Sequence, residues 1–228
     1  MALAADPTLA EGWDVARFDP PRTVGIATDA AGKQIACTVY GDLVVRESDT
    51  DMPDPEDAAL IRLPAGEASD CAAAPGPAAR KLATGGQRFL GLRAGFLVFE
   101  QASTNGMIPF AVLDAASGRT LSEDTTTYEG IDSFSVEDDG LRIAFRRRVQ
   151  ADCSIPKQDA ACWKRIVREA NILELIAALP TPVKACAAYR IGKTPRDADS
   201  IVYFPVRLAW TGSRAVAASG PVQCRPTP

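Results

Sequence analysis

The segment from Gly86 to Gln150 constrains the fold of this 228-residue chain more than any other part. It contains short runs of aliphatic, aromatic and β-branched residues, with Gly, Asp, Ser or Asn at or near the junctions between runs. The runs cover residues 89–92, 95–99, 109–114, 133–137 and 141–149. Strands separated by such turn residues form antiparallel hairpins. The segment therefore predicts an antiparallel meander.

Further strand signals lie outside this segment, at residues 13–18, 23–27, 34–47, 60–63 and 202–210. One stretch instead has the helical period, which predicts a helix over residues 159–179, capped by Asp159 and stopped by Pro180. We expect a mainly β fold, a partial or irregular propeller-like meander, with a β-sandwich as the alternative. The chain length suits one large β domain or two small domains, and we expect a single disulfide-stapled domain over residues 13–228, after a flexible remnant at 1–12.

Residues 111–121 read Ala-Val-Leu-Asp-Ala-Ala-Ser-Gly-Arg-Thr-Leu. This resembles the strand–turn–strand of a β-propeller blade of the pyrroloquinoline-quinone repeat type. In that repeat the Asp and the Ser or Thr cap a tight turn, and the Gly takes a positive φ. The resemblance implies a hairpin at residues 109–121. The Trp that usually follows is replaced by Ser122 and Glu123, and no second copy occurs at a 40-residue period, so we expect no cofactor.

The six cysteines are an even number without a Cys-x-x-Cys pair, which is typical of disulfides rather than of a metal site. They are Cys37, Cys71, Cys153, Cys162, Cys186 and Cys224. Many pairings are possible, and we expect each cysteine to pair with its sequence neighbour because every bridge then closes a local loop. Such loops would tie down segments that are otherwise rich in Gly, Pro and Ala.

The first residues indicate export. Ala2-Leu3-Ala4 fits the small-residue pattern before a secretory cleavage site, with a mature start at Ala5. Disulfides form and persist in oxidising compartments. Together these features predict a bacterial periplasmic or secreted protein. The sequence has no apolar run of about 18 residues, so we expect no membrane span.

The chain has no histidine, which excludes Ser–His and Cys–His catalysis and histidine-ligated metals. Its net charge of −4 argues against a nucleic-acid partner. Residues 154–157 match the Ser-x-x-Lys pattern of penicillin-recognising enzymes, but the companion Ser-Asp-Asn and Lys-Thr-Gly motifs are missing. Pro156 and Cys153 also disfavour the helix N-terminus that such a serine needs. We therefore predict no catalytic residues.

Residues 133–149 form the clearest hairpin signal, with Asp138-Asp139-Gly140 at the turn. The second strand alternates, with Leu141, Ile143, Phe145 and Val149 on one face and Arg142, Arg146 and Arg148 on the other. If Asp139 and Gly140 form the turn, Glu137 lies opposite Arg142, and Phe134 lies opposite Phe145. The arginine face has two interpretations: a site for an anionic ligand, or a solvated face with weak ion pairs.

Residues 49–57 contain five carboxylates and two prolines. Asp49, Asp51 and Asp54 have part of the spacing of a Ca²⁺ loop, but the glycine and the closing bidentate Glu are missing. We expect a solvated acidic loop and no metal.

These observations predict an exported, non-catalytic module that binds a protein partner or supports an envelope assembly. One alternative is a binder of a small anion that uses Arg142, Arg146 and Arg148. A second alternative is a hydrolase with a pair of carboxylates. Neither a cofactor nor a metal is expected.

Overall fold

The computed structural model describes residues 14, 16–48, 58–64, 71–73, 75–101, 107–137, 140–169, 182, 185–186, 199–209, 215–217, 220 and 222–226. The chain divides into two compact units, where the sequence predicts one domain over residues 13–228. Unit 1 comprises residues 1–104 and 108–124, and unit 2 comprises residues 105–107 and 125–228. The expected remnant at 1–12 and the acidic loop at 49–57 lie outside the described residues.

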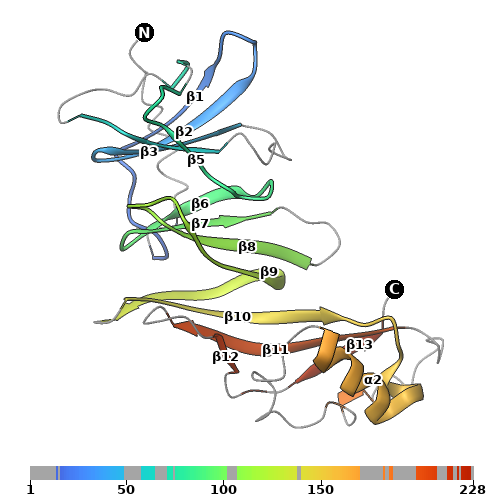
Figure 1. The fold of residues 1–228 in the computed structure, drawn as a ribbon. Coiled ribbons are helices and arrows are strands. Elements are labelled where there is room, and N and C mark those ends of the chain that lie inside the picture. The colour runs from blue at the N-terminus through green and yellow to red at the C-terminus, as the bar shows by residue number, and fades with distance from the viewer. Residues whose placement is uncertain are drawn as a thin grey trace. The chain divides into compact units, whose positions relative to one another are not determined.

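Unit 1 begins with a five-stranded antiparallel sheet in which each strand pairs with the next along the chain (Figure 1). Its strands are β1 (Thr23–Thr28), β2 (Gln34–Tyr40), β3 (Leu43–Ser48), β4 (Ala59–Arg62) and β5 (Arg80–Lys81). The run at 34–47 is thus a tight hairpin, and Gly41 takes the positive φ of 52° that its turn requires. Residues 16–18, expected to be in a strand, instead form a turn, because the Arg17 and Phe18 N–H groups donate to the Asp14 carbonyl oxygen.

The next strands of unit 1 are β6 (Arg88–Arg93), β7 (Phe96–Glu100) and β8 (Met107–Asp114), again antiparallel neighbours (Figure 1). Buried side chains from β2, β3 and β4 join those from β7 and β8 in one apolar cluster, which includes Tyr40, Leu43, Leu60, Phe99 and Leu113. These strands therefore share a core. In β6, Gly91 is required because a Cβ there would lie 2.3 Å from the Phe18 ring.

A second, smaller cluster covers the other face of the five-stranded sheet. It consists of Ile35, Cys37, Val39, Val44 and Cys71. The disulfide between Cys37 and Cys71 fixes a loop onto this face. The middle of this sheet is therefore buried on both faces.

The expected hairpin at 109–121 is present, because β8 ends at Asp114 and β9 (Thr120–Glu137) begins six residues later. The Asp114 carboxylate accepts a hydrogen bond from the Ser117 N–H, and Gly118 has a φ of 64°. This is the turn chemistry that the repeat resemblance implied at these residues. β9 passes from unit 1 into unit 2 after Asp124.

In unit 2, β9 pairs with β10 (Gly140–Gln150), and β10 pairs with β11 (Ser200–Ala209), all antiparallel (Figure 1). The predicted hairpin register is wrong by two residues. Gly140 is the partner of Glu137, so Phe134 lies opposite Ile143 rather than Phe145, and Arg142 lies opposite Ser135. Glu137 and Arg142 still form an ion pair, but across a diagonal.

The outer edge of β11 pairs with two short strands. β12 (Ala215–Ala217) pairs with Val206–Leu208, and β13 (Gln223–Pro226) pairs with Ser200–Tyr203. Pro205 lies between these two pairings, where the edge needs no N–H donor, as its lack of a donor predicts. The disulfide between Cys186 and Cys224 anchors β13.

The helix α2 (Ile155–Glu169) begins four residues before the expected start. The Ile155 N–H donates to the Ser200 hydroxyl at 2.8 Å, and Pro156 suits the first turn, where no N–H is needed. Asp159 therefore lies within the helix rather than at its cap. The predicted part beyond residue 169 lies outside the described residues.

The mainly β, antiparallel fold class is confirmed, and unit 1 contains two sets of strands around a shared core. All three disulfides join sequence neighbours as predicted, including Cys153 to Cys162. The described part of the chain contains no helix that is long and apolar enough to cross a bilayer.

Candidate functional site

Unit 2 contains an open pocket of about 220 Å³ on the arginine-bearing side of its sheet. The lining side chains come from four strands and are mostly polar or charged. They are Thr127 and Glu129 of β9, Arg146 of β10, Tyr203 of β11, and Gln223 and Arg225 of β13. Two arginines and one glutamate of the described residues thus line one small, open pocket.

An irregularity in β9 shapes one wall of the pocket. Thr126 is the partner of Arg147 and Ile131 is the partner of Phe145, so residues 127–130 lie opposite Arg146 alone. The Thr126 hydroxyl closes this bulge by donating to the Gly130 carbonyl oxygen at 2.7 Å, and Gly130 has a φ of 74°. Bulges redirect side chains out of the regular alternation. Here the bulge directs Glu129 toward Arg146.

Arg146 and Glu129 form an ion pair, with 3.2 Å between Nη1 and Oε2. Both side chains are about two-fifths exposed, at 41% and 43%. An ion pair at such exposure contributes little to stability, on the order of 0–1 kcal/mol. Arg146 is therefore available to an incoming anion that can replace the Glu129 carboxylate.

Arg225 supplies the second positive charge. Its guanidinium lies 5.6 Å from the centre of the Tyr203 ring, in cation–π contact. The two strands are in register here, with Tyr203 opposite Gln223. Arg225 is exposed and makes no ion pair with the described residues. Its charge is therefore held in position by a ring and is not neutralised by a carboxylate of the described residues.

The three arginines predicted from β10 share one face, but they have different surroundings. Arg146 lines the pocket, whereas Arg142 pairs with Glu137 near the β9–β10 turn. Arg148 is buried and donates to the Gln150 side-chain oxygen at 3.3 Å. The opposite face carries Leu141, Ile143 and Phe145 at 0–1% exposure, as predicted, while Val149 of the predicted apolar set is only partly buried.

Sequence reasoning missed the other five lining residues. Alternation along β11 places Tyr203 on the same face as Arg207, but nothing in the sequence shows that β13 adds Gln223 and Arg225 beside it. Cys224 was the available signal, because its predicted disulfide to Cys186 fixes the segment that carries both residues. For the bulge at residues 127–130, Gly130 was the one indication in the sequence.

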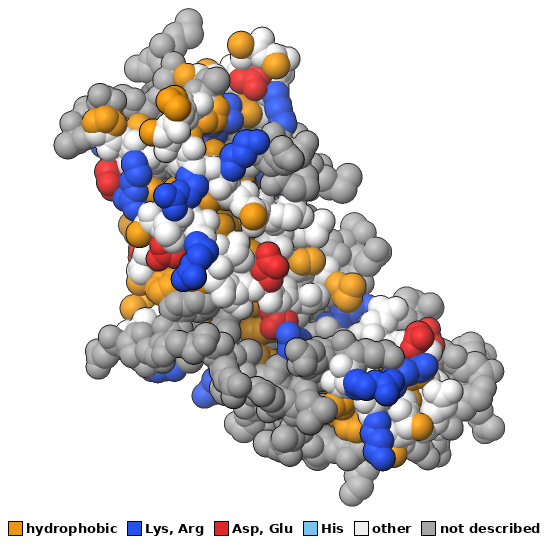
Figure 2. All heavy atoms as spheres, viewed as in Figure 1, with side chains coloured by type: hydrophobic (Ala, Val, Ile, Leu, Met, Phe, Trp, Pro, Cys, Tyr) orange, Lys and Arg blue, Asp and Glu red, His pale blue; other side chains and the backbone are white. Residues whose placement is uncertain are grey.

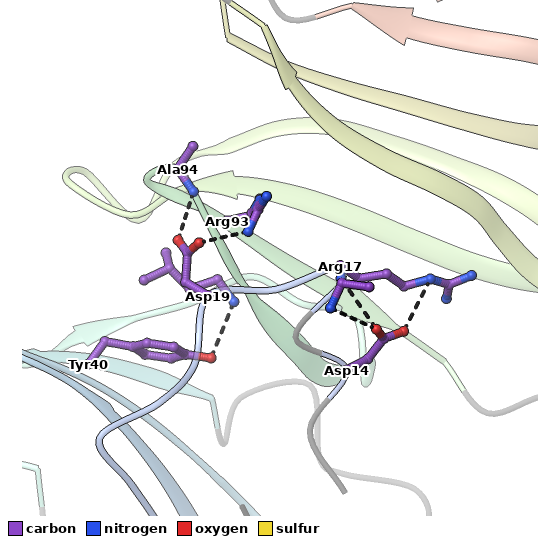
Figure 3. Close-up of polar contacts among 8 residues, drawn as sticks. Asp14, Arg17, Asp19, Tyr40, Arg93 and Ala94 are labelled. Carbon is purple, nitrogen blue, oxygen red and sulfur yellow. Dashed lines mark hydrogen bonds and ion pairs between the residues drawn. The ribbon is translucent and has the colours of Figure 1, made fainter.

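A second polar cluster lies in unit 1 and holds the chain near Asp19 (Figure 3). The Asp19 carboxylate accepts hydrogen bonds from the Arg93 side chain and the Ala94 N–H, and Ala94 has a φ of 48°. The Tyr40 hydroxyl accepts from the Leu92 N–H at 3.3 Å. Burial, with a smaller contribution from the Asp19 charge, raises the pKa of Tyr40 far above its usual range. The phenol thus stays neutral, and the cluster fixes the β6–β7 turn.

Positive charge also gathers on α2, where basic side chains lie together beside an acidic one (Figure 2). Lys164 and Arg168 are exposed, while Arg165 pairs with Asp152 at 3.1 Å. Cys162 and Ile166 occupy the buried side of this helix. The arrangement is that of a solvated helix face.

Ser154 of the Ser-x-x-Lys sequence directly precedes α2 and is buried. Pro156 and Cys153 were expected to disfavour a helix start at this point, and this was wrong because Pro156 suits the first turn of α2. The Ser154 carbonyl oxygen accepts from the Gln158 N–H at 2.8 Å, which is the bonding of a helix cap. Within the described residues, no three His, Cys, Asp or Glu side chains are grouped so that they could hold a metal ion.

Comparison with protein-family models, curated proteins and solved structures finds no match to this chain.

Proposed function

We propose that this protein binds a small anionic ligand in the pocket of unit 2, through Arg146 and Arg225. The observation that carries the proposal is that both arginines line one pocket together with the polar residues Thr127, Tyr203 and Gln223. Arginine is well suited to this role because its planar fork of N–H donors matches carboxylate and phosphate oxygens.

The residues that line the pocket favour binding over catalysis. Arginine stays protonated in proteins and accepts no proton, so neither guanidinium can act as a base. The hydrolase alternative needs two carboxylates at catalytic separation. Among the described residues, the pocket is lined by one carboxylate, Glu129, and Arg146 pairs with it. The lining thus supports recognition of an anion.

The volume limits the size of the ligand. The empty space of about 220 Å³ includes open solvent, so the enclosed part is much smaller than the sites that are common for drug-sized ligands. The pocket suits inorganic phosphate, sulfate or a short carboxylate, or one such group on a larger molecule. We expect weak affinity, on the order of 1 mM for an isolated ion.

Glu129 competes with the ligand. Its carboxylate already occupies one side of the Arg146 guanidinium, so an anion must displace it or share the donors. Replacing Glu129 with Gln would remove this internal competitor while keeping a side chain of similar size. We expect E129Q to bind anions more tightly than the parent protein.

The test is thermal unfolding with phosphate, sulfate, acetate and citrate at constant ionic strength, followed by calorimetric titration of the best ligand. A ligand that binds only the folded state raises the melting temperature by mass action. We expect R146A and R225A each to weaken binding by about tenfold or more, since a charge-assisted hydrogen bond contributes about 1.5–3 kcal/mol.

Arg207 supplies the matched control. It lies on the same side of β11 as Tyr203, is exposed, and does not line the pocket. R207A should therefore bind like the parent protein. The pocket is rejected as the site if no anion raises the melting temperature at constant ionic strength. It is also rejected if R207A and R146A lose the same affinity.

We also propose export, which the three disulfides support because such bonds persist in oxidising compartments. The expected periplasmic or secreted location, the bacterial origin and the cleaved leader belong to this proposal. A second candidate function is the non-catalytic protein-binding or envelope-assembly role expected from the sequence. The uncharged outer edge of β1 is the observation that favours it.

A further inference from the structure

β1 forms an edge of the five-stranded sheet in unit 1 and pairs only with β2 among the described residues. Its sequence, Thr-Val-Gly-Ile-Ala-Thr, contains no charge and no proline. Ile26 in its centre is 48% exposed and has the largest exposed fraction of the large apolar side chains described. Such an edge is a template for pairing with another strand.

The opposite edge of the same sheet is different. β5 is two residues long and consists of Arg80 and Lys81, both exposed. Short length and charge are the usual means of preventing edge-to-edge pairing. The sheet is thus protected against strand pairing at the β5 edge and open to it at the β1 edge. This is the pattern expected where one edge binds another strand.

The hydrogen-bond pattern shows which backbone groups of β1 point outward. The Asp29 N–H donates to the Lys33 carbonyl oxygen at 2.9 Å, so 29 and 33 form a hydrogen-bonded pair. Because such pairs alternate along an antiparallel ladder, residues 23, 25 and 27 bond to β2. Val24, Ile26 and Thr28 therefore direct their N–H and C=O groups away from β2.

We propose that two copies of this chain form a symmetric dimer by antiparallel pairing of β1 with β1, with Ile26 opposite Ile26 of the second copy. This register joins all the outward backbone groups, because Val24 of each strand then lies opposite Thr28 of the other. A two-fold axis through Ile26 makes the contact isologous, so it closes without further growth.

The side chains of β1 are compatible with pairing to β1 of a second copy. The two Ile26 side chains become neighbours on one face, which removes an exposed apolar residue of each copy from water. Val24 and Thr28 form β-branched cross-strand pairs, which are favoured in sheets. In this register Arg22 lies opposite Ala30 and Asp29 lies opposite Thr23, so no like charges face each other. The edge is thus complementary to itself.

Sedimentation velocity over a range of protein concentrations tests the dimer. We expect a monomer–dimer equilibrium, and we expect I26K to raise the dissociation constant by about tenfold or more, because two lysines would then lie side by side. V136K is the matched control, since Val136 of β9 is exposed to a similar extent, at 44%. V136K should dimerise like the parent protein. A chain that stays monomeric up to about 1 mM would overturn the proposal and leave the edge for a strand of another protein.

Cross-linking tests the register directly. In a hydrogen-bonded antiparallel pair the Cα atoms lie about 5.5 Å apart, within the range that a disulfide spans. With dissolved oxygen as the oxidant, two I26C thiols would lose their hydrogens and form a covalent dimer. V24C should not, because its counterpart lies about 13 Å away, four residues along the partner strand. Efficient cross-linking of V24C, or a dimer that persists unchanged in I26K, would reject this register.

Discussion

β3 of unit 1 and β10 of unit 2 are both inner strands that carry charged residues, yet they use them in different ways. Every residue of β3 is buried, including Arg46 and Glu47 at 7% exposure each. In β10 the buried residues alternate with more exposed ones from Gly140 to Arg146. The difference follows from what covers the sheet. Apolar clusters lie on both faces of β3, whereas one face of β10 carries the arginines and the pocket.

This difference separates charges that stabilise the fold from charges available to a ligand. Glu47 accepts a hydrogen bond from the Phe89 N–H at 2.9 Å, and the Arg46 Nε–H group donates to the Cys71 carbonyl oxygen at 3.4 Å. Buried charges persist only when paired or hydrogen-bonded in this way. Arg146 forms an exposed ion pair with Glu129, which a ligand can replace. Charge in a strand therefore indicates a binding site only where one face of the strand is open.

The largest expected effect comes from uncovering the second face of β3. Replacing both Cys37 and Cys71 by Ala should cost about 4 kcal/mol, the loop entropy for a separation of 34 residues. The matched pair in unit 2, Cys153 and Cys162, closes a loop of 9 residues and should cost about 2.5 kcal/mol. Urea unfolding followed by circular dichroism measures both. If both double variants lose the same unfolding free energy, loop length does not set the cost of removing a disulfide.

A smaller effect is expected from the charges themselves. E47A leaves the Phe89 N–H without its acceptor in a partly buried place and should destabilise the protein by about 2–3 kcal/mol. E137A removes an exposed ion pair with Arg142 and should cost less than about 1 kcal/mol. Urea unfolding of the two variants at neutral pH compares them. Similar losses for both would contradict the distinction between β3 and β10.

The sequence was sufficient where a local pattern decides the structure. Alternation placed Arg142 and Arg146 on one face, and sequence-neighbour pairing of the cysteines holds for all three bridges. The turn at Asp114 followed from its own residues, since Asp114 and Gly118 make the bonds and the φ angle that the tight turn needs.

Sequence reasoning failed where two arrangements bury the same side chains. Moving the β9–β10 register by two residues keeps every side chain on its face, so alternation could not distinguish Phe134 opposite Ile143 from Phe134 opposite Phe145. The pocket had a related difficulty. Arg225 and Arg146 are far apart in the chain, and only the pairing of β13 with β11 brings them to one cavity.

The smallest expected effect concerns Glu100 in β7. Its side chain is partly buried, so it lies between the buried charges of β3 and the exposed charges of β10. Burial raises the pKa of the Glu100 carboxyl above 4.5, and the positive charge of Arg17 opposes this shift in part. A carboxyl whose pKa is raised by folding stabilises the protein when protonated. That contribution is complete below the pKa of the unfolded chain and is lost as the pH rises through the higher pKa of the folded state.

Above the folded-state pKa, Glu100 is ionised in a place that is partly deprived of water. E100Q removes this cost, so we expect a modest rise in melting temperature at pH 7 that shrinks as the pH falls toward 4.5, where the parent carboxyl also becomes neutral. Calorimetry at several pH values measures the difference, with E123Q as the control because Glu123 is exposed in the same unit. A lower melting temperature for E100Q at pH 7 would mean that Arg17 and the cross-strand neighbour Arg88 stabilise the charge by more than burial costs. Glu100 would then act as Glu47 does, as a charge that the fold requires.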